Sequence, residues 1–434
     1  MKRIVCLLLL CALLLSGCGK KAAPAATGAT DTPTTDVPTT EAPPLTELRH
    51  TGFSGSKNLM ENVMASAVSP LAADETFAKA SLGFSAELLK HTYQSGKTLV
   101  ISPYSILTAL AMTANGAGGE TLAQFESAFG MPVAELNRYL YTLEKNAGEE
   151  LVSANSLWFS DMADFVVKQD FLQRNADYYG AETYQSAFDA QAVERINAWV
   201  KEHTKERIER IVEDLDPMAR MVLINALTFD AKWADPYEEA FTRDGTFHAA
   251  DGSTQKSTML YSEEGTYLDD GKATGFVKPY SGGRYSFFAL LPKEGVSMDD
   301  YVSTLSGEGL YQTIVNASDE TVHAAMPALK VETDLHLKEA LVAMGLTDAF
   351  SMTRADFSGI SNTPLYVDEV LHKTYFSLDN EGTQAAAVTA AIMVCTSVEM
   401  PEPKKVIIDR PYVMGILDNE SREILFFGVI NSLE

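Results

Sequence analysis

Cysteine is scarce in this chain of 434 residues: there are four, and Cys6, Cys11 and Cys18 all fall within the first 18 residues. We expect that segment to be removed or modified, which leaves Cys395 as the one thiol of the folded part. A lone thiol cannot close an intramolecular disulfide, so the class of disulfide-stapled folds is excluded. With 46% hydrophobic residues, a chain of this length can build a packed core without such staples.

Positive charge is also in short supply, because 34 Lys and Arg stand against 59 Asp and Glu and the formal net charge is −25. Proteins that bind nucleic acid or heparin-like polyanions need clustered Lys and Arg side chains. The composition therefore argues against nucleic acid as a partner and indicates a solvated acidic surface.

The sequence lacks the motifs of common catalytic and metal sites. It has no G-x-S-x-G, no H-E-x-x-H, no P-loop and no calcium-loop spacing, and its seven histidines are not spaced as metal ligands. The glycines of NGAGGE, residues 115–120, follow a segment of helical period, so they predict the end of one helix and the start of the next. We therefore expect no enzymatic activity, no metal and no cofactor.

The first 18 residues, MKRIVCLLLLCALLLSGC, predict a lipoprotein signal peptide. Lys2 and Arg3 precede an apolar run that is too short for a membrane span, and a junction of small residues follows. Residues 15–18, LSGC, resemble the bacterial lipobox, which implies that Cys18 becomes the lipid-modified first residue of the mature chain. Plain cleavage beside a chance cysteine is the alternative. We expect a secreted protein, lipid-anchored at the bacterial cell surface.

Residues 19–56 are rich in Ala, Pro, Thr and Gly, a composition typical of an extended, disordered tether. No repeat follows, so we expect residues 57–434 to form a single domain. Helical periodicity dominates early, as around Leu82 and in residues 196–212. Strand patterns dominate later, in residues 220–233, 285–293, 364–379, 404–418 and 423–430. This order predicts an α+β fold.

One late segment, DNEGTQAAAVTAAIMVCTSVEMPEP at residues 379–403, fits neither an ordinary loop nor an ordinary helix. It is a run of small, uncharged residues with several β-branched members, and it lacks the polar stripe of a surface helix.

Five separated segments resemble the serpins, in that family's order. They are ISPYSILTALAMTANGAGGETLAQFESAFG, INAWVKEHT with RMVLINALTFDAKW, LKEALVAMGLTDAFSMTRADFSGIS, LYVDEVLHKTYFSLDNEGTQAAA and DRPYVMGILDNESREILFFGVI. The resemblance covers nearly all of the chain after the tether. It implies the serpin fold, in which helices pack around three β-sheets. An exposed reactive-centre loop, here about residues 381–403, can insert into the central sheet.

The resemblance also gives the unusual segment a role, as the hinge and the reactive-centre loop. Insertion as a new strand requires alternate side chains that fit between two existing strands. The hinge is intact in this respect and has no charge after its first residue; its residues would be Glu381, Gly382, Thr383, Ala385, Ala386 and Ala387.

An intact hinge implies a suicide-substrate inhibitor of extracellular serine proteases that traps the acyl-enzyme by loop insertion. The implied partner is a serine protease, with a cysteine protease as a second candidate, and we expect a monomer. A non-inhibitory serpin that serves as a binding or storage module is the alternative. A solute-binding lipoprotein is disfavoured, because the chain ends in antiparallel strands.

The bait bond is expected at Thr396–Ser397, counted from the hinge glycine. Counting back from Pro411 gives about Val398, and Cys395 is a further alternative for the residue before the cut. No Lys or Arg lies in this part of the loop, which argues against a trypsin-like target. An elastase-like or subtilisin-like protease that accepts small or aliphatic residues is favoured.

Other positions carry over from the resemblance one by one. Trp233 matches the tryptophan at the top of the sheet, where insertion begins. A polar cluster that controls the separation of the sheet strands in serpins is matched by Ser102, Ser105, Asn225 and His372. Taken alone, His372 would be interpreted as a hydrogen-bonded core histidine.

Two departures from the family pattern stand out. The usual hinge acid falls on Asn380 and its basic partner on Ala328, so that ion pair is absent, and Glu381 would need another cation. In DRPY, Arg410 and Tyr412 stand where His and Phe are usual.

Overall fold

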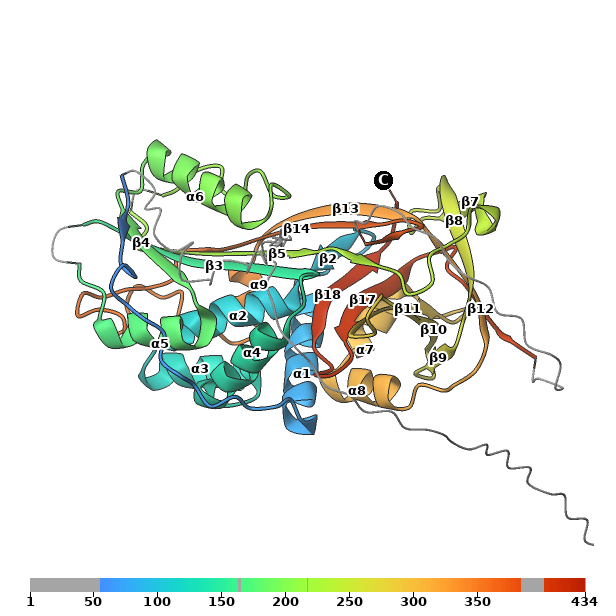
Figure 1. Ribbon diagram of the computed structural model, residues 1–434, viewed down its shortest axis with the longest axis horizontal. Coiled ribbons are helices and arrows are strands. Elements are labelled where there is room, and N and C mark those ends of the chain that lie inside the picture. The colour runs from blue at the N-terminus through green and yellow to red at the C-terminus, as the bar shows by residue number, and fades with distance from the viewer. Residues whose placement is uncertain (1–54, 163–164, 217, 384–401, 434) are drawn as a thin grey trace, which may run out of the picture. The chain divides into compact units, whose positions relative to one another are not determined.

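The structure is a computed structural model that describes residues 55–162, 165–216, 218–383 and 402–433 (Figure 1). The Asp74 carboxylate accepts a hydrogen bond from the Phe77 N–H at 2.9 Å and so caps α1, and Asp189 caps α6 in the same way. The helices are α1 (Glu75–Thr92), α2 (Pro103–Ala114), α3 (Gly119–Phe129), α4 (Val133–Asn146), α5 (Gln169–Tyr179), α6 (Ala190–His203), η2 (Glu239–Phe241), α7 (Met298–Thr304), α8 (Gly307–Val315) and α9 (Lys338–Ala343).

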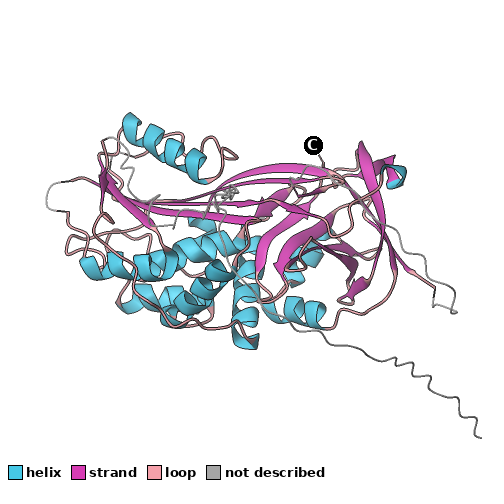
Figure 2. Ribbon diagram, viewed as in Figure 1, coloured by secondary structure: helices cyan, strands magenta, loops and turns pink. Residues whose placement is uncertain are grey.

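The strands form three large sheets and one short pair (Figure 2). The central sheet has, in order, β1 (Lys57–Asn58), β4 (Glu182–Ser186), β3 (Leu151–Ser160), β5 (Met221–Phe229), β14 (Val370–Leu378) and β13 (Leu329–His336). The second sheet has β2 (Leu99–Ile101), β18 (Ile424–Ile430), β17 (Tyr412–Asp418), β11 (Tyr285–Pro292), β10 (Ala273–Pro279) and β9 (Thr266–Asp269). The four-stranded sheet has β16 (Lys404–Ile407), β12 (Val322–Pro327), β8 (Thr254–Glu264) and β7 (Thr242–His248). The short pair is β15 (Gly382–Thr383) with β6 (Ala231–Lys232).

The central sheet is covered on both faces, and β5 shows how its sequence allows this. Leu223 and Leu227 belong to the main core, whereas Val222 and Ile224 belong to a second cluster beneath α6. Successive side chains of a strand point to opposite faces, so a strand that is apolar at nearly every position can serve two layers. Figure 1 shows α6 on one side of this sheet and α2 to α5 on the other.

The α+β fold and the three-sheet architecture confirm the prediction from sequence. The expectation that the chain ends in antiparallel strands is confirmed by the pairing of β17 with β18. Residues 115–120 lie between α2 and the first turn of α3, as the glycines indicate. In residues 364–379, only the part from Val370 onward is a strand, because the preceding part bonds elsewhere, as the Val367 N–H does to the Ala349 carbonyl at 2.9 Å.

The amphipathic segment 196–212 is helical only as far as the end of α6. Lys205 and Glu206 have φ angles of 51° and 64°, a left-handed conformation that a helix cannot continue through. Asn197 Oδ1 accepts a hydrogen bond from the Ile211 N–H at 2.8 Å, which folds the rest of the segment back onto α6. The prediction of a continuous helix was wrong here because apolar residues at helical spacing pack against the sheet without being helical.

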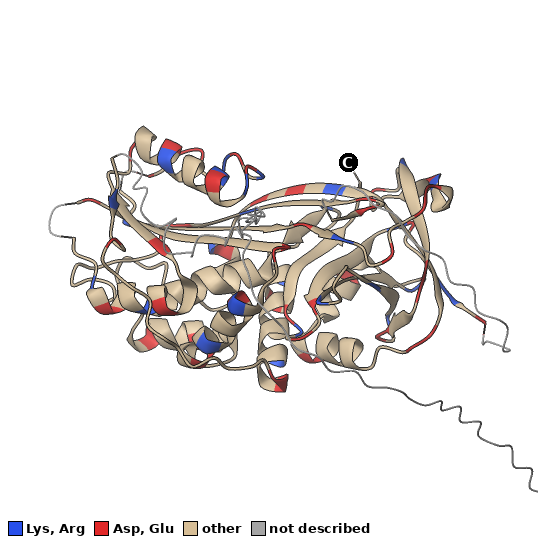
Figure 3. Ribbon diagram, viewed as in Figure 1, with Lys and Arg blue, Asp and Glu red and all other residues tan. Residues whose placement is uncertain are grey.

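Charged residues of both signs are interspersed over the described elements, and α6 carries both (Figure 3). In this view Lys and Arg are spread over several helices and strands.

Candidate functional site

The described end of the hinge is the short strand β15. It lies at one end of a gap between β5 and β14, two neighbouring strands that are paired over only three residues. Gly382 and Thr383 pair antiparallel with Lys232 and Ala231 of β6. Thr383 is buried, and its Oγ1 lies 2.6 Å from the hydroxyl oxygen of Tyr280. A Cβ on Gly382 would lie 2.2 Å from the Ala231 carbonyl oxygen, so this close approach of two backbones requires glycine.

The turn that leads into this strand is held by hydrogen bonds to three successive carbonyls. The Trp233 indole N–H donates to the Asp379 carbonyl at 3.0 Å, and the Trp233 backbone N–H donates to the Glu381 carbonyl at 3.0 Å. The Tyr237 backbone N–H donates to the Asn380 carbonyl at 2.9 Å. Trp233 is thus in direct contact with the hinge, and sequence reasoning missed Tyr237 because it stands in no recognised motif.

Trp233 is itself held by aromatic packing. Its ring stacks on the ring of Tyr280, with centroids 4.4 Å apart and an interplanar angle of 11°. Because Tyr280 also contacts Thr383, the rings of Trp233 and Tyr280 form a platform beneath both the hinge turn, residues 379–381, and strand β15.

The strands on either side of the hinge are joined at one end only. β5 and β14 run parallel and pair in register over 223–225 and 370–372. β5 is meanwhile paired with β3 along its whole length, and β14 with β13. Among the described residues, each of the two strands therefore has one completed edge and one edge that has no partner beyond these three pairs.

The predicted polar cluster lies at the closed end of this gap. His372 is opposite Asn225 across the β14–β5 ladder, and its Nε2 accepts a hydrogen bond from the Ser102 backbone N–H at 3.0 Å. Ser102 caps α2, accepting at Oγ from the Ser105 N–H at 3.2 Å. The structure therefore brings all four predicted residues together. The Asn225 side-chain amide also donates a hydrogen bond to Asn155 of β3. Sequence reasoning missed Asn155, although a polar residue inside an apolar strand was a usable signal.

Full burial lowers the pKa of His372 to about 3, so the ring is neutral at physiological pH. A neutral ring leaves Nε2 free to accept the Ser102 N–H, which an imidazolium could not do. His372 therefore joins the two strands of the gap to the start of α2.

The structure shows the local contacts at and beside the positions that depart from the family pattern. The Ala328 N–H donates to the Thr258 carbonyl at 2.8 Å, so this position joins the four-stranded sheet to the central one. Within the described residues, the Glu381 carboxylate pairs with no Lys or Arg. Arg410 Nη2 donates to the Pro292 carbonyl at 3.0 Å, and Tyr412 is buried.

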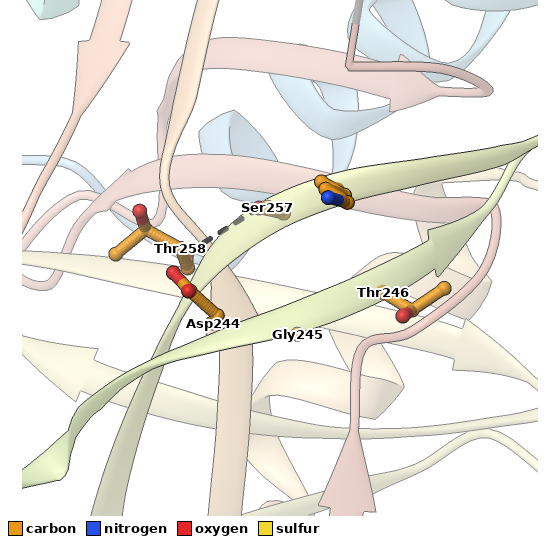
Figure 4. A pocket seen from close by; sticks show the side chains of 6 residues that line it. Asp244, Gly245, Thr246, Ser257 and Thr258 are labelled. Carbon is orange, nitrogen blue, oxygen red and sulfur yellow. Dashed lines mark hydrogen bonds between the residues drawn. The ribbon is translucent and has the colours of Figure 1, made fainter.

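Several predicted residues lie outside the described part of the chain and stay predictions: Cys18, Ala385, Ala386, Ala387, Cys395, Thr396, Ser397 and Val398. The described part holds no helix both long and apolar enough to cross a bilayer, and no group of three or more His, Cys, Asp or Glu placed to hold a metal ion. A pocket of about 510 Å³ on β7 and β8 shares no residue with the hinge; it is lined by Asp244, Gly245, Thr246, Lys256, Ser257 and Thr258 (Figure 4).

The sequence profile of the family described as Serpin (serine protease inhibitor) matches residues 79–433. The chain belongs to the serpin family. Serpins are generally inhibitors of proteases and not enzymes. Among solved structures, this serpin is similar to tengpin, a thermophilic serpin, in its native state: the TM-score is 0.82 at 41% identity, over 87% of this chain and 100% of tengpin. The TM-score against tengpin in its latent state is 0.74 at 38% identity, over 84% of this chain and 100% of that one.

Two curated relatives extend the comparison. An uncharacterised serpin-like protein of Thermococcus kodakarensis is 32% identical over 358 residues, which cover 80% of this chain and 83% of that protein. Leukocyte elastase inhibitor A of Mus musculus is 29% identical over 381 residues, which cover 82% of this chain and 100% of that protein.

Proposed function

We propose that this serpin is a suicide-substrate inhibitor of extracellular serine proteases whose loop inserts between β5 and β14 after cleavage. The observation that carries the proposal is the gap between these strands, closed at one end and with hinge strand β15 at the other. β15 runs antiparallel to β6, which directly follows β5. A strand that continued from β15 into the gap would be antiparallel to both neighbours, so two antiparallel ladders would replace one short parallel ladder.

In the proposed reaction, the protease serine attacks the carbonyl carbon of Thr396. The C–N bond to Ser397 breaks, the new amine leaves with a proton, and the protease remains bound as an ester of Thr396. Loop insertion then competes with hydrolysis of this ester by water. The 14 residues from Thr383 to Thr396, at about 3.3 Å each, span about 46 Å. Insertion therefore carries the attached protease along the sheet and distorts its catalytic geometry.

The composition of the loop supports an elastase-like or subtilisin-like target, because residues 388–403 contain no Lys or Arg. The similarity to a protein named leukocyte elastase inhibitor A points in the same direction. A cysteine protease is a second candidate target.

We also propose that the protein is a monomer anchored through a lipid on Cys18 at the surface of a bacterial cell, with residues 19–56 as its tether. The support is the lipobox-like LSGC and the composition of the segment that follows it. A lipid anchor would place the inhibitor where secreted proteases reach the cell.

The alternative is a serpin without inhibitory activity that serves as a binding or storage module. The observation that favours it is the hinge turn, where Asn380 and Ala328 cannot form the family's usual ion pair and no described cation pairs with Glu381. If the hinge rests in a different position, insertion becomes slower than hydrolysis of the ester, and the protease is released.

The deciding experiment mixes the purified protein with an elastase, a subtilisin and trypsin, followed by denaturing gels and mass spectrometry of the released C-terminal peptide. We expect a denaturant-resistant adduct with the elastase or the subtilisin, none with trypsin, and a peptide that begins near Ser397. Clean cleavage without an adduct, also across a broader protease panel, would contradict inhibition and favour the alternative.

A further inference from the structure

A fully buried ion pair lies next to the platform that holds the hinge. Lys278 of β10 and Glu264, the last residue of β8, have Nζ and Oε1 2.9 Å apart, and their side chains are 3% and 6% exposed. In the described residues, this is the one Lys or Arg ion pair in which both side chains are below 10% exposed. Removing two charges from water is costly and is compensated only by close, well-directed contacts. Substituting one partner alone would therefore leave an uncompensated buried charge.

The ammonium group of this pair faces two aromatic rings of the hinge site. Lys278 Nζ lies 4.4 Å from the ring centroid of Tyr237 and 5.5 Å from that of Trp233. Both distances are within the range of a cation–π interaction, which is stronger where water is excluded. Glu264 fixes the position of the ammonium group, and the ammonium group in turn attracts both rings.

Those two rings belong to the residues that hold the hinge turn. Through its backbone N–H and indole N–H, Trp233 binds the carbonyls of Glu381 and Asp379, and the Tyr237 N–H binds that of Asn380. A continuous set of contacts therefore runs from the ion pair through the rings to three successive hinge carbonyls. Asn380, which cannot form an ion pair of its own, is one of the residues held in this way.

We infer that Lys278 and Glu264 are positioning residues for loop insertion: by fixing Trp233 and Tyr237, the buried pair holds the hinge turn at the open end of the β5–β14 gap. Its charges act through the rings and never contact a protease. The inference rests on the proposed insertion mechanism, and it specifies which side chains set the resistance of the gap to an entering strand.

The test measures entry of a strand without any protease. The probe is a labelled synthetic peptide with residues 383–394 of this chain, TQAAAVTAAIMV, whose annealing is followed by fluorescence anisotropy. The key variant is the double substitution Lys278→Met and Glu264→Met, which removes both charges without leaving either one buried alone. We expect it to anneal the peptide about 10-fold faster than the unsubstituted chain.

A second readout locates the effect. Hydrogen exchange at the backbone amides of Trp233 and Tyr237 should speed up about 10-fold in the double variant, while exchange at Ser102, at the closed end of the gap, should not change. A general loss of stability would instead accelerate exchange at all three amides and lower the urea midpoint of unfolding.

The control is the exposed pair Lys293–Asp269, whose Nζ and Oδ1 are 2.8 Å apart and whose side chains are 39% and 41% exposed. Lys293→Met with Asp269→Leu should leave the annealing rate within about twofold. Exchange at Trp233 and Tyr237 as slow in the double Met variant as in the unsubstituted chain would overturn the inference, whatever the protease assay shows. A chain that forms no protease adduct, but whose double variant shows faster exchange at these two amides, would overturn the proposed function and support the role of the pair.

Discussion

Glu423, which directly precedes β18, is a carboxylic acid in a fully buried position. Neither of its carboxylate oxygens has a hydrogen-bond partner among the described residues. Burial raises the pKa of Glu423 to about 8, and the nearby Ser81 hydroxyl opposes this only in part. At neutral pH the folded chain therefore keeps a proton on Glu423 that the unfolded chain, with a pKa of 4.5, has released.

This single residue predicts a pH dependence of stability. Between pH 4.5 and pH 8 the folded state binds more protons than the unfolded state at this position, so the free energy of unfolding falls as pH rises. In Glu423→Gln that contribution is absent. We expect the stability of the variant, relative to the original chain, to increase by about 4 kcal/mol between pH 4 and pH 8.

Urea unfolding of both proteins at several pH values measures this difference. Stability curves that run parallel from pH 4 to pH 8 would show that Glu423 finds a partner that lets it ionise in the folded state.

At the scale of elements, the hinge strand and its two neighbours decide the proposed reaction. Within the part of the chain that the structure describes, β5 and β14 each have an unpaired edge beyond their shared residues, and β15 is positioned to begin a new strand there. Thr383 is the first hinge residue whose side chain would enter the core, and it is already buried. A charge on this side chain could not occupy that buried position without a large desolvation cost, so the hinge could not begin insertion from it.

We therefore expect Thr383→Arg to abolish trapping but not cleavage, with adduct formation falling more than about 10-fold. Denaturing gels with the elastase or subtilisin that reacts with the original chain measure the ratio of adduct to cleaved product. Thr254→Arg is the matched control, because it places the same side chain on an exposed strand position and should leave this ratio unchanged. A stable adduct with the Thr383→Arg variant would mean that trapping does not require this residue to enter the sheet.

At the scale of the whole molecule, insertion would change the stability of the entire fold, because the central sheet contacts both core clusters. Inserting residues 383–394 would add on the order of 20 backbone hydrogen bonds at about 1 kcal/mol each. Ordering the same residues costs about 1 kcal/mol each. The difference raises the free energy of unfolding by about 8 kcal/mol.

This gain predicts that cleavage in the loop stabilises the protein. A domain of this size gains roughly 1.3 °C in Tm for each kcal/mol, so the cleaved protein should unfold about 10 °C above the intact one. Circular dichroism melts before and after cleavage of the loop measure the shift. Cleaved Thr383→Arg should show no such increase, and equal Tm values for the intact and cleaved original chain would contradict insertion.

Prediction from sequence succeeded where the signal is local and failed where a distant contact decides. The glycines of residues 115–120 mark a boundary by their own conformational preferences, and they were placed correctly between α2 and α3. The end of α6 was missed, because Asn197 binds the backbone of Ile211 across a fold-back that no helical period reveals. Lys278 and Glu264 were missed for a related reason, since each stands in an ordinary strand pattern.

The sequence by itself determined the α+β class and the small hinge residues that carry no charge after Glu381, because these depend on the period and size of neighbouring side chains. Only the tertiary structure decided which residues meet. Ser102 reaches His372, and Lys278 reaches both Glu264 and the rings beneath the hinge, through sheet registers that join segments far apart in the chain. Those registers are set by the packing of whole elements, so no local pattern encodes them.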